Sequence, residues 1–234
     1  MIGLLREKGY SFADYLNYSN FNKAVILRHD VDFSLEKALE MAEIEKKEEV
    51  QSTYFILLST NFYNIFSKES CDIIKKIQSL GHNIGLHFDE KKYDITDKES
   101  MEFYITKEKE IFEEVLDMET QVVSMHRPSK WVLESDLQFE KILNTYSQEF
   151  FKNFKYVSDS RMHWREDVME IIKEENFQRL HILTHPFWYS DKDEAMKEKL
   201  LHFIKKAEFE RYRSLKDNFR DLDEVIEEEE VRCL

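Results

Sequence analysis

Short apolar runs alternate along this chain with amphipathic stretches of helix length, and this alternation limits the possible folds more than any other feature. The runs of strand length are Ala24–Leu27, Ser52–Leu58, Asn83–Leu86, Val122–Met125, Lys155–Ser158 and Arg179–Thr184. Strands that alternate with helices of about 10–15 residues form βαβ units and a parallel sheet. We therefore expect an α/β fold whose sheet is either doubly wound or closed as a barrel. In both, ligands bind at the carboxyl ends of the strands.

The helices are predicted from their caps and apolar faces. They are expected over 1–20, 34–42, 67–80, 96–116, 134–146, 165–175 and from 191 to the end. Ser34 and Ser67 can each cap a helix, and Gly81 is typical of the residue after a helix end. Thr96 with Glu99 is typical of a capping box. We expect one domain over 1–234, with its core motifs in 24–190 and a helical extension over 191–234.

The charge of the chain excludes several classes of partner. The net charge is −14, from 34 basic and 48 acidic residues, and a field of this sign repels nucleic acid and anionic membranes. No apolar run approaches the roughly 18 residues that a membrane span requires. The N-terminus has no signal-peptide pattern, and Cys71 and Cys233 form no metal-binding pair. These features favour a cytoplasmic protein.

The first predicted strand ends in ionisable residues. Arg28-His29-Asp30-Val31-Asp32 follows the apolar run directly. Because side chains alternate along a strand, Asp30 and Asp32 should point to one face and His29 to the other. Two carboxylates on one face repel each other unless a cation or a shared proton holds them. A helix cap or a surface turn is the alternative interpretation, since Asp and Ser favour both.

Later strands end in the same kinds of residue, and this favours a functional site. The residues at predicted strand ends are His29, His87, His126, His185, Asp30, Asp32, Asp89 and Asp159. Histidine and carboxylate donors without thiolate suit zinc or a similar divalent ion with an open position for water. A serine nucleophile is weakly supported, because there is no G-x-S-x-G elbow. Ser129 also follows a proline and is not expected to open a helix.

Six motifs, in this order, resemble those of the polysaccharide deacetylase superfamily, the NodB-homology or carbohydrate esterase family 4 proteins. They are RHDVD (28–32), STYFILL (52–58), GHNIGLHFD (81–89), MHRPS (125–129), VSDSRMHW (157–164) and LHILTHPFW (180–188). The first motif looks like that of a divergent branch with HDVD. The resemblance implies a distorted (β/α)7 barrel of NodB type. It also implies removal of acetyl groups from N-acetylated sugars, or cleavage of related amides, with a metal-activated water.

The resemblance also assigns roles to matching residues. In the first motif one Asp is the general base and the other a metal ligand, here Asp30 and Asp32; we take Asp30 as the base, although the order stays open. His87 matches the first ligand of the second motif. The position of the second ligand holds Lys91, whose ammonium has no lone pair. A third donor must then come from elsewhere on the rim.

Two residues can supply that donor. Asp89 shares a strand face with His87, whereas His126 ends the next strand and offers an imidazole, which suits zinc. We favour His126 and keep Asp89 as the alternative. The same resemblance assigns roles to four further residues: Arg127 would orient the catalytic acid, His185 would be the general acid, and Trp131 and Trp188 would be apolar walls.

The sequence thus predicts a metal-dependent hydrolase that removes an acetyl or other acyl group from an N-acylated sugar in glycan metabolism or biosynthesis. The cofactor would be a divalent ion, zinc first, with cobalt, manganese and nickel as alternatives. The partner would be a small-molecule or glycan substrate. Two alternatives stay open. One is an amidohydrolase acting on a small non-sugar amide; the other is a degenerate barrel that binds without turnover, which Lys91 favours.

Overall fold

The computed structural model describes residues 1–232, which form two compact units. The first unit is Met1–Tyr189, and the second begins at Ser190. The first unit contains all the strands and all six motifs. Cys233 lies outside the described residues.

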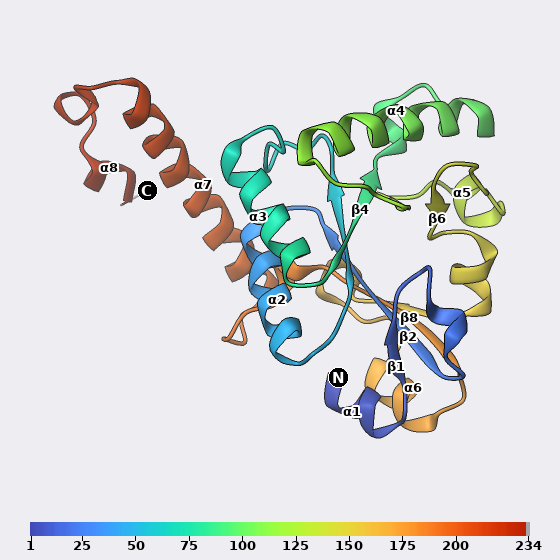
Figure 1. The fold of residues 1–234 in the computed structure, drawn as a ribbon. Coiled ribbons are helices and arrows are strands. Elements are labelled where there is room, and N and C mark those ends of the chain that lie inside the picture. The colour runs from blue at the N-terminus through green and yellow to red at the C-terminus, as the bar shows by residue number, and fades with distance from the viewer. Residues whose placement is uncertain (233–234) are drawn as a thin grey trace. The chain divides into compact units, whose positions relative to one another are not determined.

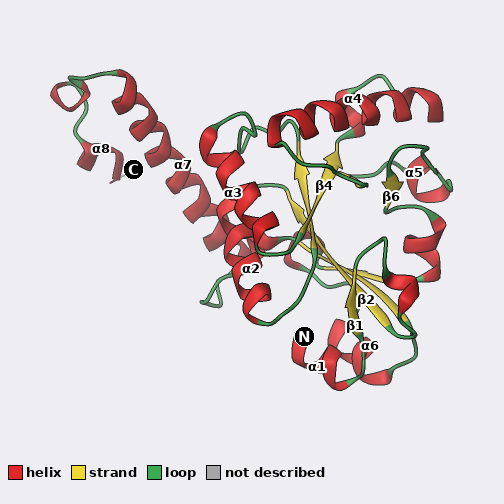
Figure 2. Ribbon diagram, viewed as in Figure 1, coloured by secondary structure: helices red, strands yellow, loops and turns green. Residues whose placement is uncertain are grey.

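Every strand pair in the first unit is parallel. The strands are β1 Ser11–Ala13, β2 Ala24–Val31, β3 Thr53–Leu57, β4 Asn83–Phe88, β5 Val122–Met125, β6 Leu143–Asn144, β7 Lys155–Ser158 and β8 Arg179–Thr184. Their order is β6-β5-β4-β3-β2-β8-β7, and β1 pairs with the first half of β2. Over residues 1–232 the end strands β6 and β7 do not pair. The curled sheet is therefore an open barrel, as Figure 2 shows, and the expected distorted barrel is confirmed.

Helices connect the strands and cover the outer face of the sheet (Figure 1). They are α1 Ile2–Glu7, α2 Leu35–Lys47, α3 Lys68–Ser79, α4 Lys98–Leu116, α5 Lys130–Glu134 and α6 Val168–Glu174. Ser34 and Ser67 cap α2 and α3 as predicted, each accepting a hydrogen bond from a backbone N–H of the first turn. Gly81 follows α3 with φ +100°, a conformation that side chains disfavour. These local rules fix where two crossovers begin and end.

The strands are buried on both faces, so apolar side chains form separate layers. Val25 and Leu27 of β2 face outward and pack in the cluster that includes α1 and α6 residues. Ile26 faces the barrel interior with Phe55. Gly85 of β4 makes room for that ring, because a Cβ there would lie 2.4 Å from it. The interior is thus closed by apolar residues below the carboxyl ends of the strands.

Two predicted helices are wrong. The stretch 1–20 contains α1 and then β1, because Ser11–Ala13 pairs with Ala24–Ile26 of β2. The stretch 134–146 is mostly a loop that contains β6, and its buried Ile142 and Tyr146, four residues apart, imitate the spacing of a helix face. In both places a strand of two or three residues is too short to show a period in the sequence.

Two predicted caps are also corrected. The capping box of α4 joins Asp97 to Ser100, one residue later than the expected pair of Thr96 and Glu99. Ser129 does open a helix, since its Oγ accepts a hydrogen bond from the N–H of Val132 at 3.3 Å and caps α5.

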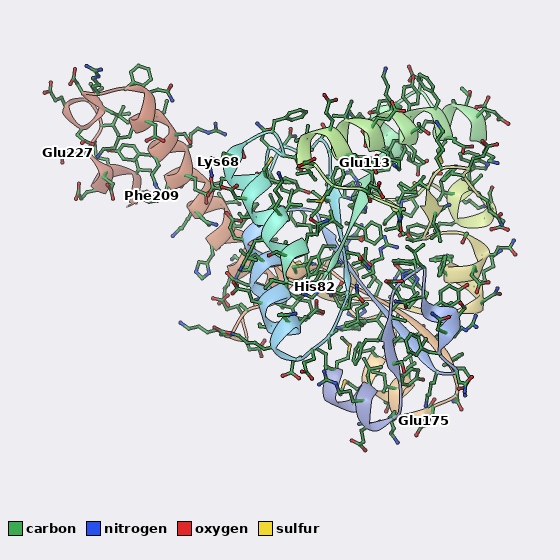
Figure 3. The ribbon with its side chains drawn as sticks, in the orientation of Figure 1. Lys68, His82, Glu113, Glu175, Phe209 and Glu227 are labelled. Atoms are coloured by element: carbon green, nitrogen blue, oxygen red, sulfur yellow. The ribbon has the colours of Figure 1, made fainter. Side chains whose placement is uncertain are left out.

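The second unit is helical, with α7 Met196–Asn218 and α8 Glu228–Arg232. Its best-buried aromatic residue, Tyr212, donates a hydrogen bond to Asp223 at 2.7 Å and stacks with Phe209, which Figure 3 labels. No helix in the described part of the chain is long and apolar enough to cross a membrane.

Candidate active site

A cleft of about 970 Å³ lies at the carboxyl ends of the strands. Its floor includes Asp30, Asp32, His87, His126 and His185, which follow or end β2, β4, β5 and β8. These strands belong to one parallel sheet, with β3 between β4 and β2, so their ends meet at one rim. The sheet therefore brings together residues that are up to 155 positions apart in the sequence.

Asp30 is held from below by Arg28. Both residues belong to β2 and point to the same face, and both are buried. The guanidinium donates from Nε to Oδ1 and from Nη2 to Oδ2, each at 2.8 Å. Burial disfavours the carboxylate, but Arg28 outweighs it and lowers the pKa of Asp30. Asp30 is thus ionised and fixed in orientation at the floor of the cleft.

Arg28 is itself enclosed by partners from other strands. Its Nη2 donates to Ser124 of β5, and Thr145 and Tyr146 lie at 3.4 Å from guanidinium nitrogens. The guanidinium also lies over the ring of Phe55, 5.3 Å from its centroid. These contacts form a polar layer between the apolar interior and the cleft.

Asp32, His87 and His126 present three donor atoms to one point. Asp32 Oδ1, His87 Nε2 and His126 Nδ1 are each 3.2 Å from the other two. His87 Nδ1 donates to the backbone carbonyl of Ser124 at 3.2 Å, so in the neutral ring Nε2 keeps its lone pair for the cluster. The carboxylate oxygen of Asp32 therefore faces the lone pair of His87 Nε2.

This cluster fits a divalent ion. Ligand bonds of about 2.0–2.2 Å around tetrahedral zinc separate the donor atoms by roughly 3.4 Å, close to the 3.2 Å found. Asp32 Oδ1 is buried, and no residue in 1–232 gives it a hydrogen bond of acceptable geometry. Burial opposes the charge of Asp32, but His126 and His87 outweigh it and hold its pKa far below the usual range. An ion would satisfy this oxygen and both rings.

His185 pairs with Asp159 on the other side of the cleft floor. Its Nδ1 lies 2.6 Å from Asp159 Oδ1, and its backbone N–H donates to Oδ2 at 3.0 Å. Nε2 lies 3.9 Å from Asp32 Oδ2. Burial disfavours the imidazolium, but Asp159 and Asp30 outweigh it and raise the pKa of His185. The raised pKa favours the imidazolium form of His185, whose Nε2 lies beside the cluster of Asp32, His87 and His126.

His29 points away from the cleft, as strand alternation predicts. Its Nε2 bonds to Glu45 of α2 at 2.8 Å, and its Nδ1 to Thr184 at 2.7 Å. Ser52 also donates to Glu45, and His82, labelled in Figure 3, bonds to Ser52. This buried network supports β2 from behind and does not supply groups to the cleft.

Arg127, which was expected to orient a catalytic group, lies at the rim of the cleft. Its side chain is 60% exposed and pairs with Asp89 at 2.8 Å, whereas Arg28 holds Asp30. Asp89 is occupied by Arg127 and by the N–H of Lys91. The structure therefore brings His126, and not Asp89, to Asp32 and His87.

The two predicted tryptophans lie in different surroundings. Trp188 lines the cleft and packs against Phe33 and Phe187. Trp131, on α5, is 39% exposed and is not one of the described residues that line the cleft. Of the two, Trp188 lies at the cleft itself.

Arg28 and Asp159 had no role assigned from the sequence, but the sequence contained a signal for each. Arg28 stands two residues before Asp30 on the same strand face, and that spacing alone makes an ion pair possible. Asp159 belongs to the set of strand-end residues, but its pairing with His185 depends on β7 lying beside β8.

No family model and no curated protein sequence matches the chain. Among solved structures it is similar to a mutant of BA3943, a CE4 family pseudoenzyme of Bacillus anthracis, in the form with restored enzymatic activity. The identity is 17%, the match covers 80% of this chain and 64% of that one, and the TM-score is 0.46. This chain therefore spans less than two thirds of the BA3943 chain.

Two further structures are similar over more of their own length. One is a family 4 carbohydrate esterase from Bacillus anthracis, at 16% identity, with 88% of this chain and 85% of that one covered and a TM-score of 0.45. The other is the chitin deacetylase of the fungus Colletotrichum lindemuthianum, at 16% identity, 78% and 81% coverage and a TM-score of 0.42.

Proposed function

We propose that this protein is a metal-dependent hydrolase that removes an acyl group, acetyl first, from the nitrogen of an N-acylated sugar. The observation that carries the proposal is the triangle of Asp32, His87 and His126 between an ionised Asp30 and a His185 of raised pKa. A hydrolase of amides needs a base, an acid and a means to polarise the carbonyl. The three parts meet at one cleft.

The surroundings of each residue in the cleft support a different role for it. Asp32, His87 and His126 would hold a divalent ion, zinc first, which when bound polarises a carbonyl and acidifies water. Asp30 would take the proton of the attacking water, since its charge is kept by Arg28. His185, oriented by Asp159, would give a proton from Nε2 to the departing amine. Trp188 would pack against the sugar ring.

Acetate release tests this proposal. The full chain would be stripped with a chelator, reloaded with zinc, cobalt, manganese or nickel, and incubated with N-acetylated sugars and with small non-sugar amides. We expect acetate from the sugars only in the metal-loaded protein. Release from the small amides alone would favour the amidohydrolase alternative, and metal binding without any release would favour a barrel that binds without turnover. The cytoplasmic location remains a prediction.

A further inference from the structure

The wall of the cleft beside β7 carries two arginines that the proposed chemistry does not use. Arg161 and Arg165 stand in the segment between β7 and α6 that also contains Asp159. Both line the cleft. They follow Asp159 by two and six residues, so the segment that holds His185 in place also carries these two charges.

The other charged side chains that line the cleft have partners within the protein. The pairs are Asp30 with Arg28, Asp32 with His87 and His126, Asp89 with Arg127, Lys92 with Glu108, and Glu166 with Lys155. Arg161 and Arg165 have no ion pair or side-chain hydrogen bond to any residue in 1–232. The cleft of a chain with net charge −14 thus keeps two uncompensated positive charges.

The backbone that presents Arg161 is strained. Arg161 has φ +57° and Met162 has φ +58°, the left-handed region that residues with a Cβ seldom enter. Two such residues in succession cost stability, and strain of this kind gathers at ligand-binding segments. Neither position is a glycine, so the turn is not explained by a residue that prefers it.

The two guanidinium groups of Arg161 and Arg165 indicate which chemical group of a ligand they would bind. A guanidinium binds phosphate or carboxylate through a planar fork of donors. A phosphate ester carries about −1.5 to −2 charges near neutral pH, which two arginines balance, whereas one sugar carboxylate carries a single charge. Fixed positive charges also raise the local concentration of an anionic substrate.

We propose that the substrate is an N-acylated sugar that bears a phosphate, as in a sugar phosphate or a nucleotide- or lipid-linked sugar diphosphate, and that Arg161 and Arg165 bind this phosphate. This inference rests on the proposed function and names its substrate class. The phosphate lies on the β7 side of the cleft while the acyl nitrogen faces His185.

Competing substrates and matched variants test the inference. The probes are N-acetylglucosamine, its 1-phosphate, its uridine diphosphate ester, a short-chain polyprenyl diphosphate ester, and N-acetylmuramic acid, which bears only a carboxylate. We expect kcat/KM for a phosphorylated probe to exceed that for the neutral sugar and the carboxylate sugar by about tenfold or more, given the strength of charged hydrogen bonds. Which ester is best identifies the source of the phosphate. The preference should fall as salt is raised.

Arg161→Gln and Arg165→Gln should each reduce that preference about threefold or more, and the double variant should remove it. Arg6→Gln is the control, because Arg6 is an exposed arginine on α1, paired with Glu48, and should keep the preference. Calorimetric titration of metal-free protein with N-acetylglucosamine 1-phosphate measures binding without turnover. We expect binding that both variants weaken and Arg6→Gln does not.

The outcomes separate the two proposals. Turnover of N-acetylated sugars without a preference for phosphate, or with an equal preference for N-acetylmuramic acid, overturns this inference and leaves the deacetylase proposal. Arginine-dependent binding of the sugar phosphate with no turnover of any probe supports the phosphate site and contradicts the deacetylase. If the protein shows no turnover of any probe and no arginine-dependent binding, both proposals are contradicted.

Discussion

Arg28, two residues before Asp30 on the same strand, donates two hydrogen bonds of 2.8 Å to the carboxylate of Asp30. Both side chains are almost completely buried. A carboxylate removed from water in this way stays charged only while the guanidinium is present. The pair therefore links the stability of the barrel to the state of a proposed catalytic group.

Arg28→Met should lower the free energy of unfolding by about 3–5 kcal/mol, because it leaves Asp30 buried without its partner. Asp30→Asn added to Arg28→Met should recover much of the loss, since no buried charge then remains. Urea unfolding of the wild type, both single variants and the double variant measures the coupling. Strictly additive effects of the two substitutions would show that the pair does not hold Asp30.

The pairing also shows how far a motif can be carried over. The resemblance favoured Arg127 as the orienting residue because of its place in the order of motifs. In the structure Arg127 pairs with Asp89, and a second arginine, Arg28, holds Asp30 two residues further along β2. The periodicity of β2 could have predicted the pair, but burial decides whether such a pair forms, and burial depends on β5 and on Tyr146.

Asp159→Asn should reduce kcat by a factor of about 10²–10⁴, because an amide cannot hold both donors of His185 as the carboxylate does. His185→Ala should cause a loss of the same order. Both variants should keep their metal, since neither residue belongs to the triangle. Asp167→Asn, at the exposed cap of α6, is the control and should keep full activity. Near wild-type kcat in either cleft variant would remove that residue from the mechanism.

Trp188→Ala should raise KM about tenfold, the loss expected when one aromatic contact to a ligand is removed. Trp131→Ala serves as the matched control, because the Trp131 ring lies outside the described lining of the cleft. Steady-state kinetics on the best sugar substrate gives both values. Equal effects of the two substitutions would contradict the placement of the substrate beside Trp188.

His181 should make the fold less stable in mild acid. Burial, followed by repulsion from Arg28, lowers the pKa of His181 to about 3, and Tyr15 and the carbonyl of Phe150 occupy its ring nitrogens. Unfolded histidine titrates near 6.5. Below that pH His181 therefore binds a proton in the unfolded chain but not in the folded chain, so the free energy of unfolding falls as pH falls.

The expected slope from His181 approaches about 1.4 kcal/mol per pH unit below pH 6. Unfolding of wild type and His181→Gln between pH 7 and 5 tests it, because carboxylates titrate mostly below this range. The difference in stability between the two proteins should shrink as pH falls. His163→Gln removes an exposed histidine and should leave the slope unchanged. A constant difference between wild type and His181→Gln would contradict the lowered pKa.

The parallel sheet and the rim of histidines and aspartates could be predicted because apolar runs and polar strand ends are local patterns. Strands β1 and β6 could not, since each exists only through pairing with a longer neighbour. The choice between Asp89 and His126 likewise depended on a contact across strands. Asp89 shares a strand face with His87, but its carboxylate turns to Arg127.

Metal content of His126→Ala and Asp89→Ala tests the central claim most directly. Wild type, both variants and His87→Ala would be dialysed against a mild chelator, and zinc measured per chain, with circular dichroism to confirm folding. We expect one equivalent in wild type and Asp89→Ala, and little or none in His126→Ala and His87→Ala, because two protein donors hold a divalent ion weakly. A full equivalent in folded His126→Ala with an empty Asp89→Ala would contradict the triangle of Asp32, His87 and His126, and an empty wild type would contradict the metal centre itself.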